Sequence, residues 1–460
     1  MVKKLLIANR GEIAARILRA CREMCIDAVT VYSTADAESL HAMFAEEAVC
    51  IGPPRAADSY LNADAILTVA KATGCDAVHP GYGFLSENAD FADACRAAGL
   101  TFVGPSGDVI RKMGNKAAAR ALMQSVGVPV VPGSDGPVAS AEEAQAVADR
   151  IGYPVLIKAA AGGGGRGMRR VYGPEELADA FREAAAEALA CFGSDEMYLE
   201  KLILQPRHIE FQILADRFGN VIQLGERDCS VQRKNQKLLE ETPSHGLTPE
   251  LREQMGAAAV LAAKAAGYEN AGTVEFVLAP DKSFYFIEMN TRIQVEHPVT
   301  EMVTAMDLVR EQIRIASGLP LRIRQEDVQL HGHAIECRIN AEDPAHGFAP
   351  RPGKADFLYF PGGPGVRIDT CMYNGYEIPP YYDSMVAKVI AWAPTRLEAI
   401  RRMRRALEEL IIDGLQTNAE LMHQILYHPT FVRGNYTTAF LDEHLESLLD
   451  WISRVEASEE

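Results

Sequence analysis

The strongest constraint on the fold is the alternation of short apolar runs with helical patterns over about the first 100 residues. The apolar runs are Leu5 to Ala8, Ala28 to Tyr32, Ala77 to His79 and Thr101 to Val103. Between the first two runs, apolar residues recur at helical spacing from Ile13 to Cys21. Strands joined through helices pair in parallel, because the helix returns the chain to the same edge of the sheet. This part of the chain is therefore predicted to be α/β, a parallel sheet covered by helices.

The start of the chain and its charge disfavour several binding functions. The turn after the first predicted strand, Asn9 to Glu12, holds one glycine, whereas a dinucleotide-binding turn needs three at fixed positions. The formal net charge of -17 repels nucleic-acid phosphates, and no concentrated basic patch stands out. The run Leu5 to Ala8 is too short for a signal core or a membrane span. We therefore expect a cytoplasmic protein that binds no NAD, nucleic acid or membrane.

The pattern changes after the breaker-rich segment Val128 to Pro137, which we interpret as a linker or joint before a second domain. Ile209 to Asp216 and Val221 to Gly225 flank a short turn, as the two strands of a hairpin do. A second hairpin is predicted within Thr273 to Asn290. Antiparallel hairpins after a parallel sheet indicate α+β structure in the middle of the chain.

The last third repeats this mixture of strands and helices. Strands are predicted at His333 to Asn340, Val366 to Asp369 and Met385 to Trp392, before a helix that carries Arg401 to Arg405. The acidic end, Glu456 to Glu460, is expected to be disordered. Because one hydrophobic core seldom organises 460 residues, we expect two or three domains.

A glycine-rich segment follows the predicted strand Tyr153 to Lys158. Five of the six residues from 162 to 167 are glycine, and Lys158 and Arg166 add positive charge. Glycines gather where a flap must bend or where backbone amides approach phosphate oxygens closely. The segment is not a P-loop, because no Gly-Lys-Ser/Thr opens a helix after it. We predict a phosphate-covering flap, with a flexible linker as the alternative.

Two glutamates in the second predicted hairpin indicate a metal site. Glu275 and Glu288 are equidistant from the expected turn at Asp281 and Lys282, so they would face each other about 5 Å apart across neighbouring strands. Like charges at that spacing need a compensating cation. With Asn290 they supply oxygen ligands suited to Mg2+ that also holds nucleotide phosphates. The alternative is an exposed acidic pair, which water would screen.

Period-two alternation continues beyond this hairpin in five polar residues: Glu288, Asn290, Arg292, Gln294 and Glu296. If the strand continues, these side chains share one face. A cation, an amide and a further carboxylate beside a metal favour an anion-binding site over an exposed strand face. The strand His333 to Asn340 likewise places Arg338 on a polar face.

With Lys116, Lys158, the glycine-rich segment and the paired glutamates in this order, the chain resembles the ATP-grasp enzymes. Longer strings narrow the resemblance to the biotin carboxylase family. These strings are Asn9 to Ala14, His79 to Asn88, Arg227 to Arg233, Glu288 to Pro298 and Pro379 to Met385. The resemblance covers about Met1 to Leu445, and strings of this length are far more specific than a lone glycine motif.

The resemblance implies binding of ATP with Mg2+, or with Mn2+ in its place. Nucleotide contacts are implied for Lys116, Lys158, Gly163, Gly164, Gly165, Arg166, Gly167, Met168, Glu200, Lys201, Ile203, His208 and Gln232. The glycine-rich segment would close over the phosphates as a lid. Glu275, Glu288 and Asn290 would hold the metal.

The resemblance also implies sites for bicarbonate and biotin. Bicarbonate would be seated by Lys237, Arg292, Gln294 and Val295, and biotin would be bound by Tyr82 and Arg338. The implied catalytic residues are Glu296, Arg292, Arg338 and Lys237, with Glu296 as the base that deprotonates bicarbonate. The product, carboxyphosphate, is a mixed anhydride that water would destroy, which gives a closing lid its purpose. Arg338 would stabilise the ureido oxyanion of biotin.

One position departs from the family pattern: Asn235 stands where members often have histidine. Asparagine can hydrogen-bond but cannot carry charge, so we place Asn235 outside the catalytic set.

The resemblance divides the chain into four segments. An N-terminal α/β pre-ATP-grasp domain is expected at residues 1–113 and an ATP-grasp region at 114–329, with a mobile lid at about 134–203. A mixed α+β biotin carboxylase C-terminal domain is expected at 330–446, followed by a tail at 447–460.

No methionine is followed by lysine, so the chain lacks the Ala-Met-Lys-Met sequence that carries biotin. We therefore expect a separate biotin carboxyl carrier protein, a separate carboxyltransferase and, from the resemblance, a homodimer. The simplest assignment is the biotin carboxylase subunit of acetyl-CoA carboxylase, in fatty acid biosynthesis. Alternatives are the same subunit of a pyruvate, propionyl-CoA or related carboxylase, or an ATP-grasp carboxylate–amine ligase. A non-enzymatic nucleotide-binding subunit is disfavoured by the presence of Glu288 and Glu296.

Overall fold

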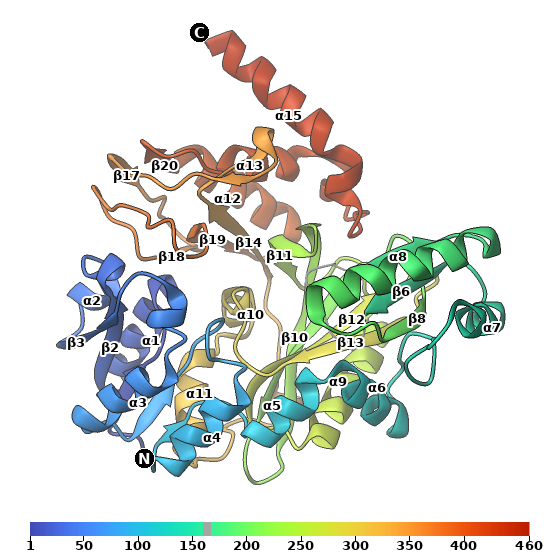
Figure 1. Ribbon diagram of the computed structural model, residues 1–460. Helices are drawn as coiled ribbons and strands as arrows, with labels where there is room; N and C mark the ends of the chain where they lie inside the picture. The colour runs from blue at the N-terminus through green and yellow to red at the C-terminus, as the bar shows by residue number, and fades with distance from the viewer. Residues whose placement is uncertain (160–166, 460) are drawn as a thin grey trace.

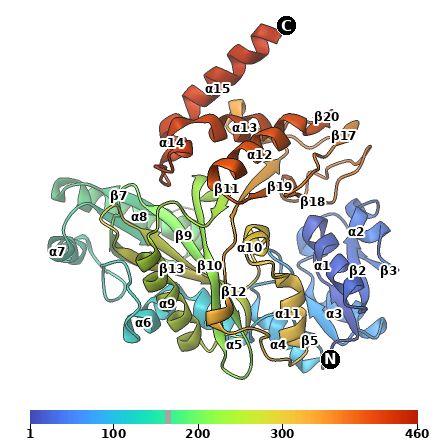
Figure 2. The same ribbon diagram turned by 180° about the vertical axis from the view of Figure 1, so that it is seen from behind.

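The computed structural model describes residues 1–159 and 167–459, and it is shown in Figure 1. An N-terminal part and a central part lie side by side, and a C-terminal part covers both. Seen from behind in Figure 2, helix α11 (Leu308–Ala316) lies between the N-terminal part and the central sheet. Its Leu308 and Ile313 share a core with Leu5 and Ala271, so these two parts pack through a common hydrophobic cluster.

The N-terminal part is a parallel sheet with strand order β3-β2-β1-β4-β5, as its sequence predicts. Its elements are β1 Lys4–Ile7, α1 Gly11–Glu23, β2 Asp27–Ser33, α2 Leu40–Met43, β3 Glu47–Gly52, α3 Ala63–Ala72, β4 Ala77–His79, α4 Ala89–Ala97, β5 Thr101–Phe102 and α5 Gly107–Gly114. Leu5 packs with α1 and Leu6 with α3, because successive strand side chains point to opposite faces. The sequence interpretation missed β3, a half-buried edge strand, although Ala48 to Ile51 form a short apolar run.

A small three-stranded sheet forms a separate unit at the edge of the molecule in both views. Its strands are β6 Val155–Ala159, β7 Met168–Val171 and β8 Met197–Lys201, in the order β7-β6-β8. Helices α7 (Ala141–Ile151) and α8 (Pro174–Phe192) pack on it around a core of its own that includes Ile157 and Leu199. The predicted contacts Gly163, Gly164, Gly165 and Arg166 lie outside the described residues.

One antiparallel sheet of eight strands joins the central and C-terminal parts, in the order β13-β12-β9-β10-β11-β14-β19-β18. Its strands are β9 Arg207–Ala215, β10 Val221–Arg233, β11 Gln236–Thr242, β12 Asn270–Leu278, β13 Phe284–Asn290, β14 His333–Asn340, β18 Val366–Thr370 and β19 Met385–Ala393. Both predicted hairpins are confirmed as β9–β10 and β12–β13. Because β11 pairs with β14, the sheet runs without a break across position 330.

The remaining helices and short elements complete the fold. The helices are α6 Lys116–Ser125, α9 Pro249–Ala266, α10 His297–Thr304, α12 Arg396–Glu409, α13 Ala419–Tyr427, α14 Pro429–Val432 and α15 Phe440–Glu459. Two small ribbons pair β15 Glu342–Asp343 with β16 Ala349–Pro350, and β17 Phe357–Tyr359 with β20 Ile411–Asp413. Short 3-10 turns lie at Thr34–Asp36, Ala56–Asp58, Gln325–Asp327 and Pro344–His346. Over the described residues, no helix is both long and apolar enough to span a bilayer.

The prediction that β13 continues to Glu296 is wrong, because the strand ends at Asn290. The next residue, Thr291, donates its backbone N–H to the carboxylate of Glu87 at 3.1 Å instead of pairing with β12. Six residues later α10 begins, with Pro298 in its first turn, where the fixed φ of proline suits a helix start. A contact from the N-terminal part and a helix start therefore replace the expected strand with a loop.

The predicted disorder of the acidic end is also wrong as far as Glu459, where α15 ends. Leu448 is buried and Leu445 and Ile452 pack against the C-terminal core, so this helix is anchored along part of its length. Its last turns extend away from the body of the molecule, as Figure 1 shows.

Candidate active site

The two predicted metal-binding glutamates are cross-strand partners. Glu275 of β12 lies opposite Glu288 of β13, with an irregularity in the pairing directly after Glu275. Asn290 donates its side-chain N–H to Glu275 Oε1 at 2.9 Å. The hairpin therefore gathers two carboxylates and an amide oxygen on one face, a donor set that suits Mg2+.

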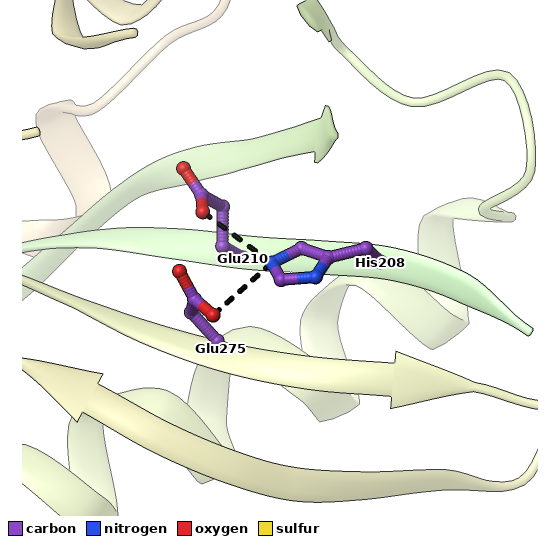
Figure 3. A group of neighbouring side chains, drawn as sticks. All are labelled: His208, Glu210 and Glu275. Carbon is purple, nitrogen blue, oxygen red and sulfur yellow. Dashed lines mark ion pairs between the residues drawn. The ribbon is translucent and has the colours of Figure 1, made fainter. Parts of the chain in front are cut away.

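Two cations compensate the charge of Glu275. The His208 Nε2 lies 3.2 Å from Glu275 and 3.7 Å from Glu210, and Figure 3 shows the ring directed toward both carboxylates. Burial alone would lower the pKa of His208, but the charge of Glu275 prevails and raises it to about 9. Lys237 supplies the second cation. Side chains of the protein therefore compensate the charge of Glu275 in this structure.

Lys237 is the centre of the charged cluster. Its ammonium contacts Glu210 at 2.5 Å, Glu275 at 2.8 Å and Glu296 at 2.7 Å. Burial lowers the pKa of this ammonium, and the three carboxylates outweigh that effect and raise it well above the ordinary value. A buried ammonium among three carboxylates stays charged, and so it can hold an anion that displaces one of them.

Glu210 and Arg227 belong to this cluster although the sequence interpretation assigned neither of them a site role. Arg227 is fully buried, and its guanidinium donates to Glu210 at 2.5 Å and to Gln294 at 2.8 Å. The signal was the alternation of His208, Glu210 and Gln212 along β9, which puts three polar side chains on one strand face. These buried partners hold Lys237 and Gln294 in fixed positions.

The loop after β13 brings the predicted anion-site residues together without a strand. Arg292 donates to Glu87 at 2.9 Å and to Asn290 at 3.2 Å. Gln294 donates to Glu275 at 3.0 Å. The backbone carbonyl of Val295 accepts from Lys388 at 2.9 Å. The loop is thus tied to both the metal-type carboxylates and the C-terminal part.

Glu296 and Arg338 form the junction of this site with the C-terminal part. Arg338 of β14 lies 2.9 Å from Glu296 Oε2, and Lys237 holds the other oxygen of that carboxylate. Burial would raise the pKa of Glu296, but the charge of Lys237, followed by that of Arg338, lowers it. Glu296 is therefore ionised, the form in which a base accepts a proton.

Tyr82, in the N-terminal part, is connected to the site through Glu12. Its hydroxyl donates to Glu12, and Glu12 also pairs with Lys388 at 2.9 Å. Tyr82 thus reaches the cluster through this buried ion pair.

The predicted nucleotide residues occupy the central part. Lys116 lies 3.7 Å from Glu288, beside a cavity of about 220 Å³ that Glu87, Met289 and Asn290 also line. Of the predicted metal-binding residues, Glu288 and Asn290 line this cavity and Glu275 does not.

Other predicted nucleotide residues have different partners. Lys158 pairs with Glu200 across β6 and β8, whereas Lys201 donates to the carbonyls of Gly152 and Tyr153 at 3.0 and 2.6 Å. Ile203 follows β8, and Gln232 lies opposite Lys237 in the β10–β11 ladder. Gly167 and Met168 are the first described residues after position 166.

The β10–β11 turn explains the residue at position 235. Lys234 and Asn235 have positive φ angles of 47° and 66°, the conformation of a tight hairpin turn in which asparagine is favoured. The conformation of the turn thus accounts for asparagine at position 235 without any contact to the nucleotide.

Family comparisons cover nearly the whole chain. Residues 1–110 match the biotin carboxylase N-terminal domain, residues 115–324 the ATP-binding domain of the carbamoyl-phosphate synthase L chain, and residues 336–443 the biotin carboxylase C-terminal domain. Biotin carboxylase 1 of Bacillus subtilis is 58% identical over 96% of this chain and 99% of its own. One of the pyruvate carboxylase subunits of Methanothermobacter thermautotrophicus is 54% identical over 96% of this chain and 90% of its own.

Solved structures agree with these matches. The biotin carboxylase domain dimer of the Hydrogenobacter thermophilus 2-oxoglutarate carboxylase, solved with MgADP, ADP and bicarbonate, is 52% identical and superposes with a TM-score of 0.92. The alignment covers 97% of this chain and 99% of that one. Sequence, fold and domain order agree along the chain, which belongs to the biotin carboxylase family.

Proposed function

We propose that this chain carboxylates biotin, using ATP and bicarbonate, as the first half-reaction of a biotin-dependent carboxylase. The observation that carries the proposal is the position of the Lys237 ammonium. It lies between the metal-type carboxylate Glu275 and the base Glu296, and Arg338 contacts the far side of Glu296. Nucleotide, anion and biotin chemistry thus meet within one connected cluster.

Glu275, Glu288 and Asn290 are the residues that would hold Mg2+. Their fit is supported by Glu288, whose pKa is raised by burial and then by the charge of Glu275 opposite it, so a divalent cation would relieve this repulsion. A metal bound here neutralises charge on the transferring phosphoryl group. Lys116 approaches the same carboxylate from α6 and would add a further positive charge.

Lys237, Arg292 and Gln294 would seat bicarbonate. Each already contacts a carboxylate or amide of the site, and an incoming anion can take over these donors. Glu296 is ionised and within the same cluster, so it would accept the bicarbonate proton and generate the nucleophile beside the γ-phosphate. The resulting carboxyphosphate is a mixed anhydride, so the site must exclude water while it exists.

Arg338 would serve the second step, in which the phosphate released from carboxyphosphate takes the ureido proton of biotin. A buried guanidinium stabilises the developing oxyanion because it is fixed in place and shielded from water. Tyr82, held by Glu12, would border the same space.

The direct test is ATP hydrolysis by the purified protein with Mg2+, bicarbonate and free biotin. We expect hydrolysis that depends on bicarbonate and increases with biotin, with carboxybiotin as product. An ATP-grasp carboxylate–amine ligase is the competing function, and it would instead release ADP in response to an amine and ignore biotin.

We further propose that the chain works with a separate biotin carrier protein and a carboxyltransferase, as a homodimer, with acetyl-CoA as the acceptor of the complete carboxylase. Relatives named for pyruvate and 2-oxoglutarate carboxylases make those keto acids the alternative acceptors. Copurification of the chain from its native cells, followed by identification of the transferase, decides among them.

A further inference from the structure

A second carboxyl pair lies behind Arg338, away from the metal-type carboxylates. Glu240 of β11 and Glu336 of β14 are cross-strand partners, and both are fully buried, with 0% of their surface exposed. Directly opposite residues on antiparallel strands have Cβ atoms about 5 Å apart. Two carboxyl groups therefore share a small volume from which water is excluded.

Glu240 fixes Arg338 from the rear. The Arg338 Nε donates to Glu240 Oε1 at 2.6 Å, while the same guanidinium reaches Glu296 at 2.9 Å. Glu336 precedes Arg338 by two residues on β14, so the two side chains share one face of the strand. The guanidinium is held between the carboxylate of the reaction site and the carboxyl pair.

Glu336 lacks the donors that a buried carboxylate requires. Among the described residues, neither of its oxygens has a hydrogen-bond partner, and Oε2 of Glu240 has none either. Burying an ionised carboxylate without donors is costly, and a second carboxylate opposite makes it worse. A carboxyl group in this position avoids the cost by keeping its proton.

The charged groups around Glu336 come from each element packed against it. They are Glu240 of β11, Arg338 of β14, Lys388 of β19 and Glu296 at the start of α10. Lys388 is engaged by Glu12 and by the carbonyl of Val295, both at 2.9 Å. His297, the first residue of α10, remains neutral because burial lowers its pKa well below the ordinary value.

The direction of the pKa shifts agrees with this geometry. Burial is the largest effect on both carboxyls, and it raises the pKa of Glu240 above its ordinary value and that of Glu336 well above it. The main charge opposing this rise is Arg338 at Glu240 and Lys388 at Glu336. Of the two, Glu336 is the group that keeps the proton.

We propose that Glu336 is a neutral carboxylic acid in the working protein and that, together with Glu240, it is a positioning residue for Arg338. The inference rests on the proposed function, in which Arg338 faces the biotin oxyanion. One negative charge behind the guanidinium orients it and leaves it able to stabilise an oxyanion. Two negative charges would attract the guanidinium away from the biotin oxyanion and offset its positive charge.

The proposal predicts a loss of the biotin step at alkaline pH. As pH rises through the pKa of Glu336, the pair gains its second negative charge and kcat/KM for biotin falls. Glu336→Gln cannot ionise and keeps nearly the same shape. We therefore expect this variant to match the wild-type kcat/KM at neutral pH within about twofold and to lose the alkaline decrease.

Two further variants separate positioning from folding. Glu240→Gln removes the charged partner of Arg338, and we expect kcat/KM for biotin to fall about tenfold while bicarbonate-dependent ATP hydrolysis without biotin is retained. Glu241→Gln alters the neighbouring residue of β11, which bonds His333 and Arg396 on the opposite face. We expect it to lower the melting temperature and to keep the wild-type pH profile.

The inference is overturned if Glu336→Gln shows the same alkaline decrease as the wild-type protein, or if it loses tenfold or more at neutral pH. Absence of biotin stimulation in the wild-type protein would instead refute the proposed function. The protonation state can then be read by infrared spectroscopy. A neutral-acid carbonyl band at neutral pH that vanishes in Glu336→Gln supports the neutral acid, and an unchanged spectrum refutes it.

Discussion

At the residue scale, the site is governed by how buried charges are compensated. Lys237 and His208 neutralise Glu275, and Arg227 neutralises Glu210, so each buried carboxylate of this cluster has a cation within hydrogen-bonding distance or close to it. Glu288 is compensated less closely, because its nearest cation, Lys116, lies 3.7 Å away. This difference makes Glu288 the carboxylate that a bound metal would affect most.

Replacing Glu288 with alanine should therefore abolish metal-dependent ATP turnover, with a loss of at least about 100-fold in kcat, because a ligand of the phosphate-bound metal is removed. Steady-state ADP release at saturating Mg2+ measures the effect. Full turnover with unchanged nucleotide affinity would refute the metal assignment.

Arg338→Ala provides the contrast at the other end of the cluster. We expect it to leave nucleotide affinity within about twofold of wild type, because Arg338 forms its ion pairs with Glu240 and Glu296 and not with the metal-type residues. Carboxylation of free biotin should fall by at least about 100-fold. A large loss of ATP affinity would contradict the separation of the two roles.

Glu241 illustrates a buried carboxylate with a structural role. Burial would raise its pKa, but Arg396, His333 and Tyr436 bond it, and its pKa lies below the ordinary value of 4.5. A depressed native pKa contributes stability above about pH 4.5 that is lost as pH falls through and below that value. Urea unfolding at a series of acidic pH values should show this loss. Glu241→Gln should lower stability by about 3 kcal/mol at neutral pH and flatten the acid dependence.

At the scale of elements, the predicted strands and hairpins are confirmed where the pattern of apolar residues continues along the whole strand. The alternation predicted a strand as far as Glu296, yet β13 ends at Asn290. Polar residues can alternate along a loop without forming a strand, because each polar side chain there contacts its own partner in the site. Glu87, 204 residues away in sequence from Thr291, replaces the strand partner at this point.

The sheet β7-β6-β8 has its own core and should open independently of the rest. Leu199→Ala removes a side chain that is 1% exposed, which should destabilise this unit by about 2–5 kcal/mol. Hydrogen exchange should accelerate in β6 and β8 and remain slow in β1 and β4.

Leu6→Ala is the matched control for this experiment, because Leu6 is fully buried in the N-terminal sheet. It should speed exchange in β1 and β4. Equal acceleration throughout the chain in both variants would show that the small sheet does not open as a separate unit.

At the scale of the whole molecule, buried ion pairs connect parts that are far apart in the sequence. Lys388 of β19 pairs with Glu12 of α1 and donates to the carbonyl of Val295 in the site loop. Arg10 lies over the ring of Tyr382, 4.1 Å from its centroid, between the N-terminal and C-terminal parts. Lys388 thereby fixes the loop that carries Glu296 against both the N-terminal and the C-terminal part.

Lys388→Met should lower the free energy of unfolding by about 3–5 kcal/mol, because Glu12 then remains buried without its cation. Combining it with Glu12→Gln should restore much of the loss. A double-mutant cycle from urea titrations measures this coupling. Additive losses in the double variant would show that the pair does not couple the two parts.

Sequence alone determined the parallel N-terminal sheet, both hairpins and the facing of Glu275 and Glu288, because these follow from hydrophobic period and turn position within short stretches of chain. Its family resemblance supplied the residues expected at the site. Tertiary structure decided that Glu210 and Arg227 complete the cluster, that β13 stops early and that β11 pairs with β14. Those features depend on the desolvation of charges and on partners distant in sequence, and a local pattern contains neither.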